Sequence, residues 1–349
     1  MEKLRKTVNQ IAYTPISEVL STLSPLHLSI IPLLFLSSSL YKIALSFRHT
    51  LHHLGFLRKH RLPVPVISVG NLTWGGNGKT PMVEFIANWL ANDFGVSPLI
   101  LTRGYGGADE AKMLQRHFNG TSVKIGVGAN RAATAASFLH KHGFVYPLDI
   151  VSFKKHIPER RIVSDKIGVA ILDDGMQHVS MSRDLEIVMV SDQNLSVIKS
   201  TILKANRFLP IYLSTMTPTH FFKPPSVSIQ LSLEVVNEKI VLCVSAIGSP
   251  NSLVQRIQKM GPLFVDRLDY SDHHQFQNED IMTIKARLNH LKNKFGSKPT
   301  IVMTEKDYDR DHKILGSLEP FEVLVLCCKL KILDHKEDEF KKLLIHSLS

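Results

Sequence analysis

A glycine-rich run in the first quarter of the sequence carries the strongest chemical signal. It reads GGNGKT and supplies the candidate nucleotide ligands Gly75, Gly76, Asn77, Gly78, Lys79 and Thr80. Glycines let backbone N–H groups close around phosphate oxygens, and a following helix turns its positive end toward the same anion. A lysine neutralises the β- and γ-phosphates, and a threonine hydroxyl coordinates Mg²⁺. The run therefore predicts a P-loop that binds a nucleoside triphosphate with Mg²⁺.

The segments on either side of this run support the P-loop. Residues 64–69 are rich in β-branched side chains and predict a buried strand, and residues 82–90 have apolar positions at helical spacing. The strict pattern has Gly five residues before Gly78, where this sequence has Thr73. We expect Gly75 and Gly76 to supply the flexibility instead. The alternative is a glycine-rich turn with an accidental Gly-Lys-Thr, and the flanking strand and helix disfavour it.

A second nucleotide signal is an apolar run at 167–172 that ends in the pair Asp173 and Asp174. Ligand groups collect at the carboxyl ends of parallel strands, and a P-loop protein needs an acidic group there for Mg²⁺. Either aspartate could instead form a turn or cap a helix. With a P-loop upstream, the pair is a candidate metal site together with Thr80.

The remaining pattern predicts the elements that position these groups. Strands and helices alternate again from residue 239, with strands expected near 300–303 and 323–327 and helices near 280–294 and 336–348. Alternation of this kind builds parallel or mixed sheets covered by helices. We expect an α/β protein with a P-loop NTPase-like domain at 63–217, a linker at 218–238 and a C-terminal α/β domain at 239–349.

Residues 1–62 form a segment of different character. Residues 25–45 are mostly apolar. No acidic residue occurs between Glu18 and Glu84, although Lys42, Arg48, Arg58, Lys59 and Arg61 do occur there. Together with a formal net charge of +11, this pattern predicts a helix that enters one leaflet of a membrane with cations at the headgroups. A buried core helix and an organellar import sequence are the alternatives.

Other classes of protein are disfavoured. Zinc-finger, RNP-type and basic-zipper patterns are absent from the sequence, so we expect no nucleic-acid partner. The three cysteines, Cys243, Cys327 and Cys328, form no CxxC pair and are expected to be reduced. The guanine-specificity pattern Asn-Lys-x-Asp is also absent, which disfavours a metallochaperone-type GTPase.

Several runs, taken together, resemble the tetraacyldisaccharide 4'-kinases of lipid A synthesis, in wording closest to the mitochondrial homologues of plants. They are VISVGNLTWGGNGKTP, LTRGYGG, ADEAKML, ILDDGMQH, SRDLEIV, SDHHQF and MTEKD. The resemblance implies two α/β/α sandwich domains joined by a short β linker, with ATP and substrate meeting in the cleft between them. It also implies Mg²⁺-dependent transfer of the γ-phosphate of ATP to the 4'-hydroxyl of a tetraacylated glucosamine disaccharide 1-phosphate, and an apolar N-terminal helix that anchors the enzyme.

The resemblance also implies roles for particular residues. Asp109 matches the catalytic carboxylate and His273 its histidine partner, while Lys79, Thr80, Asp173 and Asp174 match the phosphate and metal ligands. The substrate-binding or supporting candidates are Arg103, Glu110, Arg131, Glu305 and Lys306. A sugar hydroxyl needs a positioned proton acceptor, and an aspartate oriented by a histidine can provide one. Taken alone, Asp109 could be a solvated acid at a helix start, and the two arginines could form surface salt bridges.

Two departures from the family pattern bear on activity. Ala108 stands where the family has Gly before the catalytic aspartate. After Asp192 the chain lacks the family's Gly-Pro-Leu-Arg-Glu-Pro loop, as if a few dozen residues were missing. The expected protein is therefore a mitochondrial, membrane-associated kinase, or, as alternatives, an impaired form that binds nucleotide or lipid without efficient turnover, or a protein at the cytoplasmic face of a bacterial inner membrane.

Overall fold

The computed structural model describes residues 8, 11, 25–54, 59–71, 78–104, 109–146, 165–176, 178, 180–190 and 195–348. The chain divides into two compact units, Met1–Lys59 and His60–Ser349. The second unit contains both sheets of the protein and all of the candidate site residues. We call the parts built on these two sheets the first lobe and the second lobe.

The first unit contains the long helix α3 (Pro25–His53), which continues through Pro32. Its window Ile30–Phe47 is long and apolar enough to cross a membrane, judged by length and composition alone. Phe35, Ile43 and Phe47 in this window are exposed.

The first lobe is built on a five-stranded parallel sheet in the order β3-β2-β4-β1-β5. Its strands are β1 (Val66–Asn71), β2 (Ser97–Thr102), β3 (Lys124–Val127), β4 (Ile167–Asp173) and β5 (Leu185–Met189). Its helices are α4 (Lys79–Asn92), α5 (Asp109–His117), α6 (Arg131–His142), α8 (Leu195–Ala205) and α12 (Glu337–Leu348). The predicted strand and helix on either side of the P-loop are confirmed as β1 and α4.

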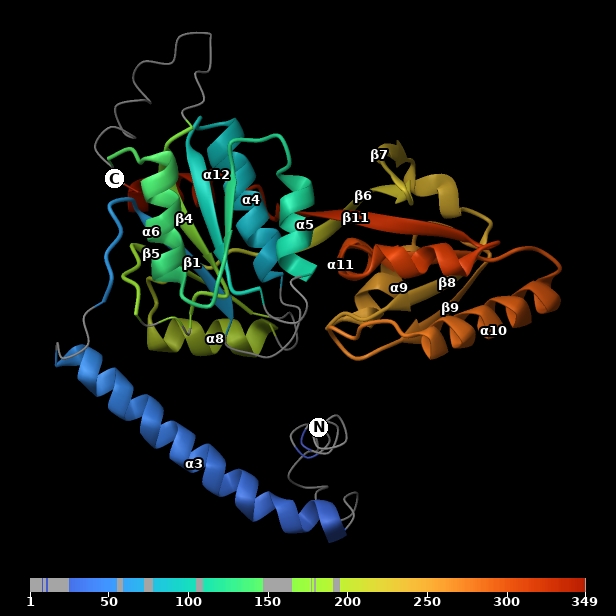
Figure 1. Ribbon diagram of the computed structural model, residues 1–349, viewed down its shortest axis with the longest axis horizontal. Coiled ribbons are helices and arrows are strands. Elements are labelled where there is room, and N and C mark those ends of the chain that lie inside the picture. The colour runs from blue at the N-terminus through green and yellow to red at the C-terminus, as the bar shows by residue number, and fades with distance from the viewer. Residues whose placement is uncertain are drawn as a thin grey trace. The chain divides into compact units, whose positions relative to one another are not determined.

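Side chains alternate between the two faces of this sheet, because successive residues of a strand point in opposite directions. Ile67 and Val69 of β1 pack with α4 and α12 in one core, and Val66 of β1 packs with Ala135 and Leu139 of α6 in another. Helices therefore cover both faces of the first sheet (Figure 1).

The second lobe is built on a six-stranded mixed sheet in the order β7-β6-β11-β10-β8-β9. Its strands are β6 (Ser214–Lys223), β7 (Ser226–Leu231), β8 (Ile240–Ser245), β9 (Phe264–Asp269), β10 (Thr300–Thr304) and β11 (Glu322–Ile332). Its helices are η2 (Leu233–Val236), α9 (Pro250–Gln258), α10 (Asn278–Phe295), α11 (Glu305–Arg310) and η3 (His312–Leu318). Strands β8, β9, β10 and β11 are parallel, and β6 and β7 are antiparallel additions.

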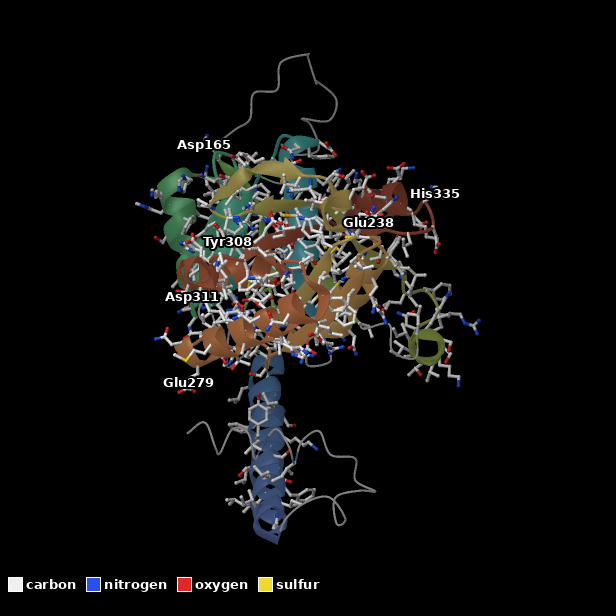
Figure 2. The ribbon with its side chains drawn as sticks, turned by 90° about the vertical axis from the view of Figure 1, so that its right-hand side faces the viewer. Asp165, Glu238, Glu279, Tyr308, Asp311 and His335 are labelled. Carbon is white, nitrogen blue, oxygen red and sulfur yellow. The ribbon has the colours of Figure 1, made fainter. Side chains whose placement is uncertain are left out.

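Helices also cover both faces of the second sheet. Helix α10 packs on one face together with Tyr308 of α11, which is labelled in Figure 2. The ring of Tyr308 meets that of Phe222 edge-on, with the ring centroids 5.0 Å apart. Leu253 and Ile257 of α9 pack on the other face. The predicted fold class, two α/β/α sandwich lobes with a separate apolar N-terminal helix, is thereby confirmed.

The two lobes are joined by an antiparallel ribbon of β6 and β11 (Figure 1). Leu330 and Ile332 of β11 lie in a core of the first lobe, whereas Val325 and Leu326 lie in cores of the second. The linker predicted at 218–238 differs from this arrangement. Most of that range forms β6, β7 and η2, which belong to the second lobe, and the connection itself consists of two paired strands.

The C-terminal helix α12 returns to the first lobe. Its buried residues Phe340, Leu344 and Leu348 join the core that contains Val83 and Ile86 of α4. Residues 337–348 were expected to belong to a C-terminal domain at 239–349, so the structure differs from the expected boundary. The helix is amphipathic, and this pattern in the sequence does not specify which lobe its apolar face packs against.

One edge of the first sheet has little cover. β5 is the edge strand, and Val188, its second-to-last residue, is 40% exposed. α8 buries none of its residues, although it carries the apolar side chains Leu195, Val197 and Leu203. The junction at 191–194, where the family's Arg-Glu loop was expected to be missing, lies outside the described residues.

Leu344→Ala should lower the free energy of unfolding by about 3 kcal/mol, because it removes a fully buried side chain from the core between α12 and α4. Chemical denaturation followed by circular dichroism measures this loss. Lys342→Ala on the exposed face of the same helix is the matched control and should change stability by less than about 0.5 kcal/mol. Equal effects of the two substitutions would contradict the docking of α12 on the first lobe.

Candidate active site

Lys79 lies at the start of α4, directly after Gly78, whose φ of 78° is in the left-handed region that favours glycine. The Lys79 ammonium donates hydrogen bonds to Asn71 Oδ1 at the end of β1 and to Asp174 Oδ1 after β4, each at 2.9 Å. These contacts hold the ammonium at the carboxyl edge of the sheet. Gly75, Gly76 and Asn77 lie outside the described residues, so their predicted contacts with phosphate stay predictions.

Asp173, the last residue of β4, faces Thr80 and Arg131. The Thr80 hydroxyl donates to Asp173 Oδ2 at 3.3 Å, and Arg131 Nη2 donates to the Asp173 carbonyl at 3.0 Å. Burial, followed by the negative charge of Asp174, raises the pKa of Asp173 to about 6. Among the described residues, neither Asp173 Oδ1 nor Arg131 Nε has a hydrogen-bond partner. A buried carboxylate oxygen without a partner is suited to a cation.

The turn after β4 packs tightly against β1. Asp174 has a φ of 53°, which is uncommon for a residue with a side chain, and Gly175 donates its N–H to the Val69 carbonyl at 3.0 Å. A Cβ atom at Gly175 would collide with Ser68 and Leu172. This glycine therefore lets the turn lie close enough to β1 for Asp173 and Asp174 to face Lys79 and Thr80. We call these four residues and Arg131 the nucleotide cluster.

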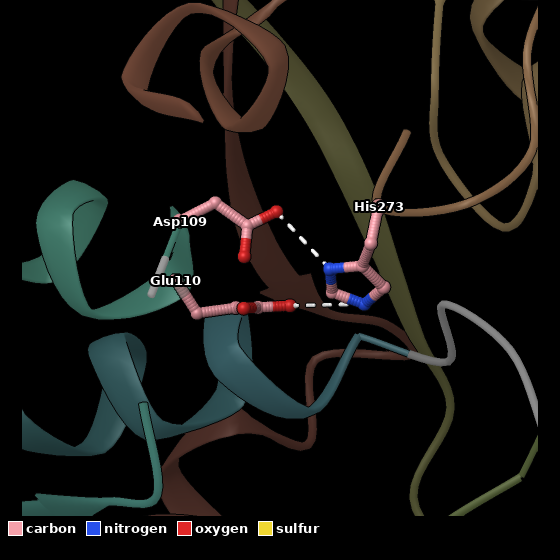
Figure 3. Close-up of side chains that lie close together, drawn as sticks. All are labelled: Asp109, Glu110 and His273. Carbon is pink, nitrogen blue, oxygen red and sulfur yellow. Dashed lines mark hydrogen bonds and ion pairs between the residues drawn. The ribbon is translucent and has the colours of Figure 1, made fainter. Parts of the chain in front are cut away.

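A second group of side chains joins the two lobes. Asp109, the first residue of α5, is fully buried and belongs to the first lobe, whereas His273 follows β9 in the second lobe. His273 Nδ1 lies 3.2 Å from Asp109 Oδ2 (Figure 3). An ionised carboxylate can only accept, so Nδ1 carries the proton in this pair. His273 has a φ of 62°, and such strain in a residue with a side chain is often found at functional sites.

Lys306 and Glu110 complete this group, which we call the acceptor cluster. Lys306 Nζ lies 3.0 Å from Glu110 Oε1 and 3.3 Å from His273 Nε2. Asp109, Glu110 and His273 lie close enough together to bind a metal ion, with their ligand atoms within 4.8 Å of one another. The Lys306 ammonium already neutralises Glu110, so we interpret the cluster as a site for an uncharged hydroxyl.

The charges of the acceptor cluster set its protonation states. Burial alone would raise the pKa of Asp109, but the hydrogen bond from His273, the adjoining Glu110 carboxyl group, the positive charge of Lys306 and the hydrogen bonds from Arg310 hold it well below its usual range. The hydrogen bond to Asp109 raises the pKa of His273. Burial and the neighbouring Asp109 raise the pKa of Glu110. Asp109 is therefore a carboxylate at neutral pH.

A third set of charged side chains bridges the lobes beside the acceptor cluster. Arg116 of α5 forms a bidentate ion pair with Asp309 and also donates a hydrogen bond to Glu305. Asp309 and Glu305 both belong to α11. His117 places Nε2 2.8 Å from Glu305 Oε1 and Nδ1 2.9 Å from Glu84 Oε1, the second as an ion pair outside hydrogen-bond geometry. Glu305, which the sequence grouped with Lys306, thus faces this bridge and not the acceptor cluster.

The sequence analysis missed Arg310, Asp307 and Arg116. Arg310 is buried and donates to Asp109 Oδ2 through Nε at 3.2 Å and through Nη2 at 2.9 Å. The spacing of Lys306 and Arg310 could have indicated that Arg310 belongs to the site. The two residues are four positions apart in MTEKDYDR, so they lie on the same face if this segment is a helix. Arg116 offered no comparable signal. Arg103, which directly follows β2, is exposed. Burial is the main cause that lowers the pKa of Arg131, and the positive charge of Arg103 lowers it further.

Both clusters lie at one edge of the first sheet. Lys79 follows β1, Asp173 ends β4 and Asp109 follows β2, and these three strands are parallel neighbours. Because the carboxyl ends of parallel strands meet at the same edge, α4 and α5 begin on the same side. The contact between His117 and Glu84 places the two helices next to each other. The edge therefore places the Lys79 ammonium and the buried, ionised carboxylate of Asp109 at the ends of nearby parallel strands.

Known proteins of one family resemble most or all of this chain. A family model described as tetraacyldisaccharide-1-P 4'-kinase matches residues 30–210 and 205–349. "Probable tetraacyldisaccharide 4'-kinase, mitochondrial" from Arabidopsis thaliana is 47% identical over 393 aligned positions, which cover 100% of this chain and 98% of that protein. A tetraacyldisaccharide 4'-kinase from Coxiella burnetii is 27% identical over 278 positions, covering 77% of this chain and 79% of that protein.

A solved structure has the same fold. It is LpxK from Aquifex aeolicus in complex with ATP, with a TM-score of 0.58 and 21% identity over 92% of this chain and 99% of that one. The alignment with the Arabidopsis protein has 393 positions against the 349 residues of this chain, so that relative has at least 44 residues without a counterpart here. A missing internal block of a few dozen residues, as predicted, is consistent with this difference.

His117→Gln should destabilise the protein in a pH-dependent way. Although burial opposes protonation, the hydrogen bond to Glu305 and the ion pair with Glu84 raise the pKa of His117 from 6.5 to about 9. The stability that the protonated ring contributes is therefore fully present below pH 6.5 and is lost as the pH rises through about 9. The difference in melting temperature between wild type and variant should be largest near pH 6 and smallest above pH 9. The exposed His140→Gln is the control, and a difference independent of pH would contradict the ion pair.

Proposed function

The chain belongs to the tetraacyldisaccharide-1-P 4'-kinase family, and we propose that it transfers the γ-phosphate of ATP to the 4'-hydroxyl of a tetraacylated glucosamine disaccharide 1-phosphate. The product of this transfer is lipid IVA, an intermediate of lipid A synthesis. The observation that carries the proposal is the pair of clusters at one sheet edge. Lys79 and Asp173 are suited to a triphosphate and its cation, and Asp109 with His273 is suited to an acceptor hydroxyl.

On the nucleotide side, each residue has a distinct task. Lys79 exchanges its contacts with Asn71 and Asp174 for the β- and γ-phosphates of ATP. Arg131 offers to the same anion its Nε, which has no hydrogen-bond partner in the part of the chain that the structure describes. Thr80, Asp173 and Asp174 would hold Mg²⁺, and the high pKa of Asp173 indicates a carboxyl group without enough positive charge around it. When bound, Mg²⁺ neutralises charge on the phosphate oxygens.

On the acceptor side, Asp109 receives the proton of the hydroxyl. The hydroxyl oxygen forms a bond to the γ-phosphorus, the bond between that phosphorus and the β-γ bridging oxygen breaks, and ADP leaves with the electron pair. A carboxylate of low pKa suits this reaction, since the transition state is loose and the hydroxyl keeps its proton until late. His273 orients the carboxylate through Nδ1, and Lys306 offsets negative charge brought by the phosphoryl group.

The substrate's acyl chains imply a membrane, and α3 is suited to meet it. The helix presents exposed apolar side chains over the window Ile30–Phe47 and is long enough to enter a bilayer. The Arabidopsis relative is described as mitochondrial, which supports a mitochondrial location for this chain. The partners are thus a membrane surface and an acylated disaccharide phosphate.

Asp109→Asn and Lys79→Ala should impair different steps. Asp109→Asn should lower turnover by about 100-fold or more with little change in the dissociation constant for ATP, because Asp109 acts on the acceptor hydroxyl. Lys79→Ala should raise that dissociation constant by about tenfold or more, because it removes the charge that faces the phosphates. Transfer from radiolabelled ATP to the acylated disaccharide 1-phosphate measures turnover, and calorimetry measures ATP binding.

Matched controls show whether the variants remain folded. Melting temperatures of both should be recorded, and Gln115→Ala, at an exposed position of the same helix as Asp109, serves as a surface control for α5. Unchanged turnover in Asp109→Asn would remove its assigned role. A wild-type protein that binds ATP and transfers no phosphate to the lipid would overturn the proposed reaction while leaving the nucleotide site intact.

Deleting residues 1–59 should release the protein from membranes. The deletion should end at Lys59, because the backbone of His60 pairs with Ser180 and Ser182 in the folded second unit. Flotation with vesicles of phosphatidylcholine and cardiolipin measures binding, and ATP affinity should stay unchanged in the deletion variant. Continued flotation at wild-type levels would show that α3 is not the anchor.

A further inference from the structure

The buried guanidinium of Arg310 uses all of its hydrogen-bonding capacity. Its side chain is 1% exposed. Nε and Nη2 donate to Asp109 Oδ2, Nη1 donates to Asp307 Oδ1 at 2.9 Å and to the His274 carbonyl at 3.2 Å, and Nη2 also donates to the Ala246 carbonyl at 3.1 Å. Arginine has five N–H donors in a rigid fork, and here each of them has an acceptor. The orientation of the group is therefore strongly determined.

The acceptors on the second lobe hold Arg310 in place independently of Asp109. Asp307 is fully buried; its Oδ1 accepts from the Ala246 N–H at 3.0 Å and its Oδ2 accepts from the Thr304 hydroxyl at 2.7 Å. The guanidinium thus rests on a side chain that is itself fixed at both oxygens. A network of this kind, with every member satisfied, is rigid.

The two oxygens of Asp109 have different surroundings. Oδ2 receives three donors, two from Arg310 and one from His273. Oδ1 has no hydrogen-bond partner among the described residues. All three donors come from the second lobe, whereas Asp109 belongs to the first. The fork therefore fixes the plane of the carboxylate through one oxygen and leaves the other oxygen to accept a hydrogen bond.

We propose that Arg310 is a positioning residue for phosphoryl transfer, which turns Asp109 so that Oδ1 faces the acceptor hydroxyl. The inference rests on the proposed function, because it assigns Arg310 a task in that reaction. The reaction rate can fall about 100-fold when a catalytic group is displaced by about 1 Å, so a residue that never touches the substrate can still control turnover. Arg310 acts through Asp109 alone and leaves the nucleotide cluster unaffected.

Arg116 provides a matched control, because it is also a lobe-bridging arginine. It binds Asp309 and Glu305 across the same pair of helices, α5 and α11, and makes no contact with Asp109 among the described residues. If Arg310 served only to hold the lobes together, substitutions of the two arginines would have similar consequences. A positioning role predicts that only Arg310 affects the chemistry of Asp109.

The test compares Arg310→Gln, Arg310→Lys and Arg116→Gln in the full-length protein. We expect Arg310→Gln to lower kcat by about 100-fold with the KM for ATP unchanged, and Arg310→Lys to recover part of the loss because it restores the charge without the fork. Arg116→Gln should lower the melting temperature with a change in kcat of about threefold or less. Equal losses of kcat in Arg310→Gln and Arg116→Gln would overturn the proposal.

A double-mutant cycle with Asp109→Asn separates positioning from general destabilisation. If Arg310 acts through Asp109, the double variant Asp109→Asn/Arg310→Gln should be no slower than Asp109→Asn alone. A kcat of the double variant that is lowered by the product of the two single losses would overturn the proposal.

The pH profile gives a second readout. The pKa of Asp109 depends on its burial and on four neighbouring groups, His273, Glu110, Lys306 and Arg310. Loss of the Arg310 cation should therefore raise the pKa of Asp109. The acid limb of kcat should therefore move to higher pH in Arg310→Gln and stay in place in Arg116→Gln. An acid limb that does not move in Arg310→Gln would count against the proposal.

A measurement without turnover distinguishes failure of this inference from failure of the proposed function. The pKa of His273, followed by NMR of the imidazole, should rise in Arg310→Gln, because a nearby positive charge is removed and Asp109 loses its other partner. It should stay unchanged in Arg116→Gln. An unchanged His273 in both variants would overturn the role of Arg310, whether or not the wild-type protein transfers phosphate.

Discussion

The site depends on one constraint: a carboxylate from the first lobe is bonded by donors from the second. Asp109 begins α5 in the first lobe, and its oxygen Oδ2 is held by His273 and Arg310 from the second. Each of these donors is anchored within its own lobe, His273 by a backbone hydrogen bond to Ala246 and Arg310 by Asp307. The geometry of the carboxylate therefore exists only when the lobes are together, and the bridge from Arg116 and His117 to α11 supports that state.

Two buried carboxyl groups at the same sheet edge show opposite behaviour. Asp173 has too few positive groups around it, so burial dominates and its pKa is raised to about 6. Asp109 is equally removed from solvent, but cations and hydrogen-bond donors hold its pKa below the usual range. The first arrangement favours binding of an added cation, and the second keeps a fixed negative charge. Environment thus gives two chemically identical side chains different protonation behaviour, with a raised pKa for Asp173 and a lowered pKa for Asp109.

Local patterns in the sequence predicted the parts of the site that lie close together along the chain. The strand, glycine-rich loop and helix around Lys79 and the pair at Asp173 follow from periodicity and from parallel-sheet geometry. The pairing of Asp109 with His273, 164 positions apart, came from the family resemblance, since no local pattern reports such a contact. Arg310 was missed for the same reason. The path of β6 and β11 between the lobes and the docking of α12 depend on which apolar surfaces meet, and an amphipathic pattern does not specify its partner.

The return of α12 has a consequence for how the protein can be made. Phe340, Leu344 and Leu348 complete the core beneath the P-loop helix, although the whole second lobe precedes them in the sequence. During synthesis most of the nucleotide-binding lobe emerges first from the ribosome but lacks this layer until residues 337–348 have been made. The second lobe, whose elements lie between, can complete its own cores earlier. A nascent chain or a fragment ending before residue 337 would therefore expose the apolar face of α4, so that chaperones become most important for the part of the protein that is synthesised first.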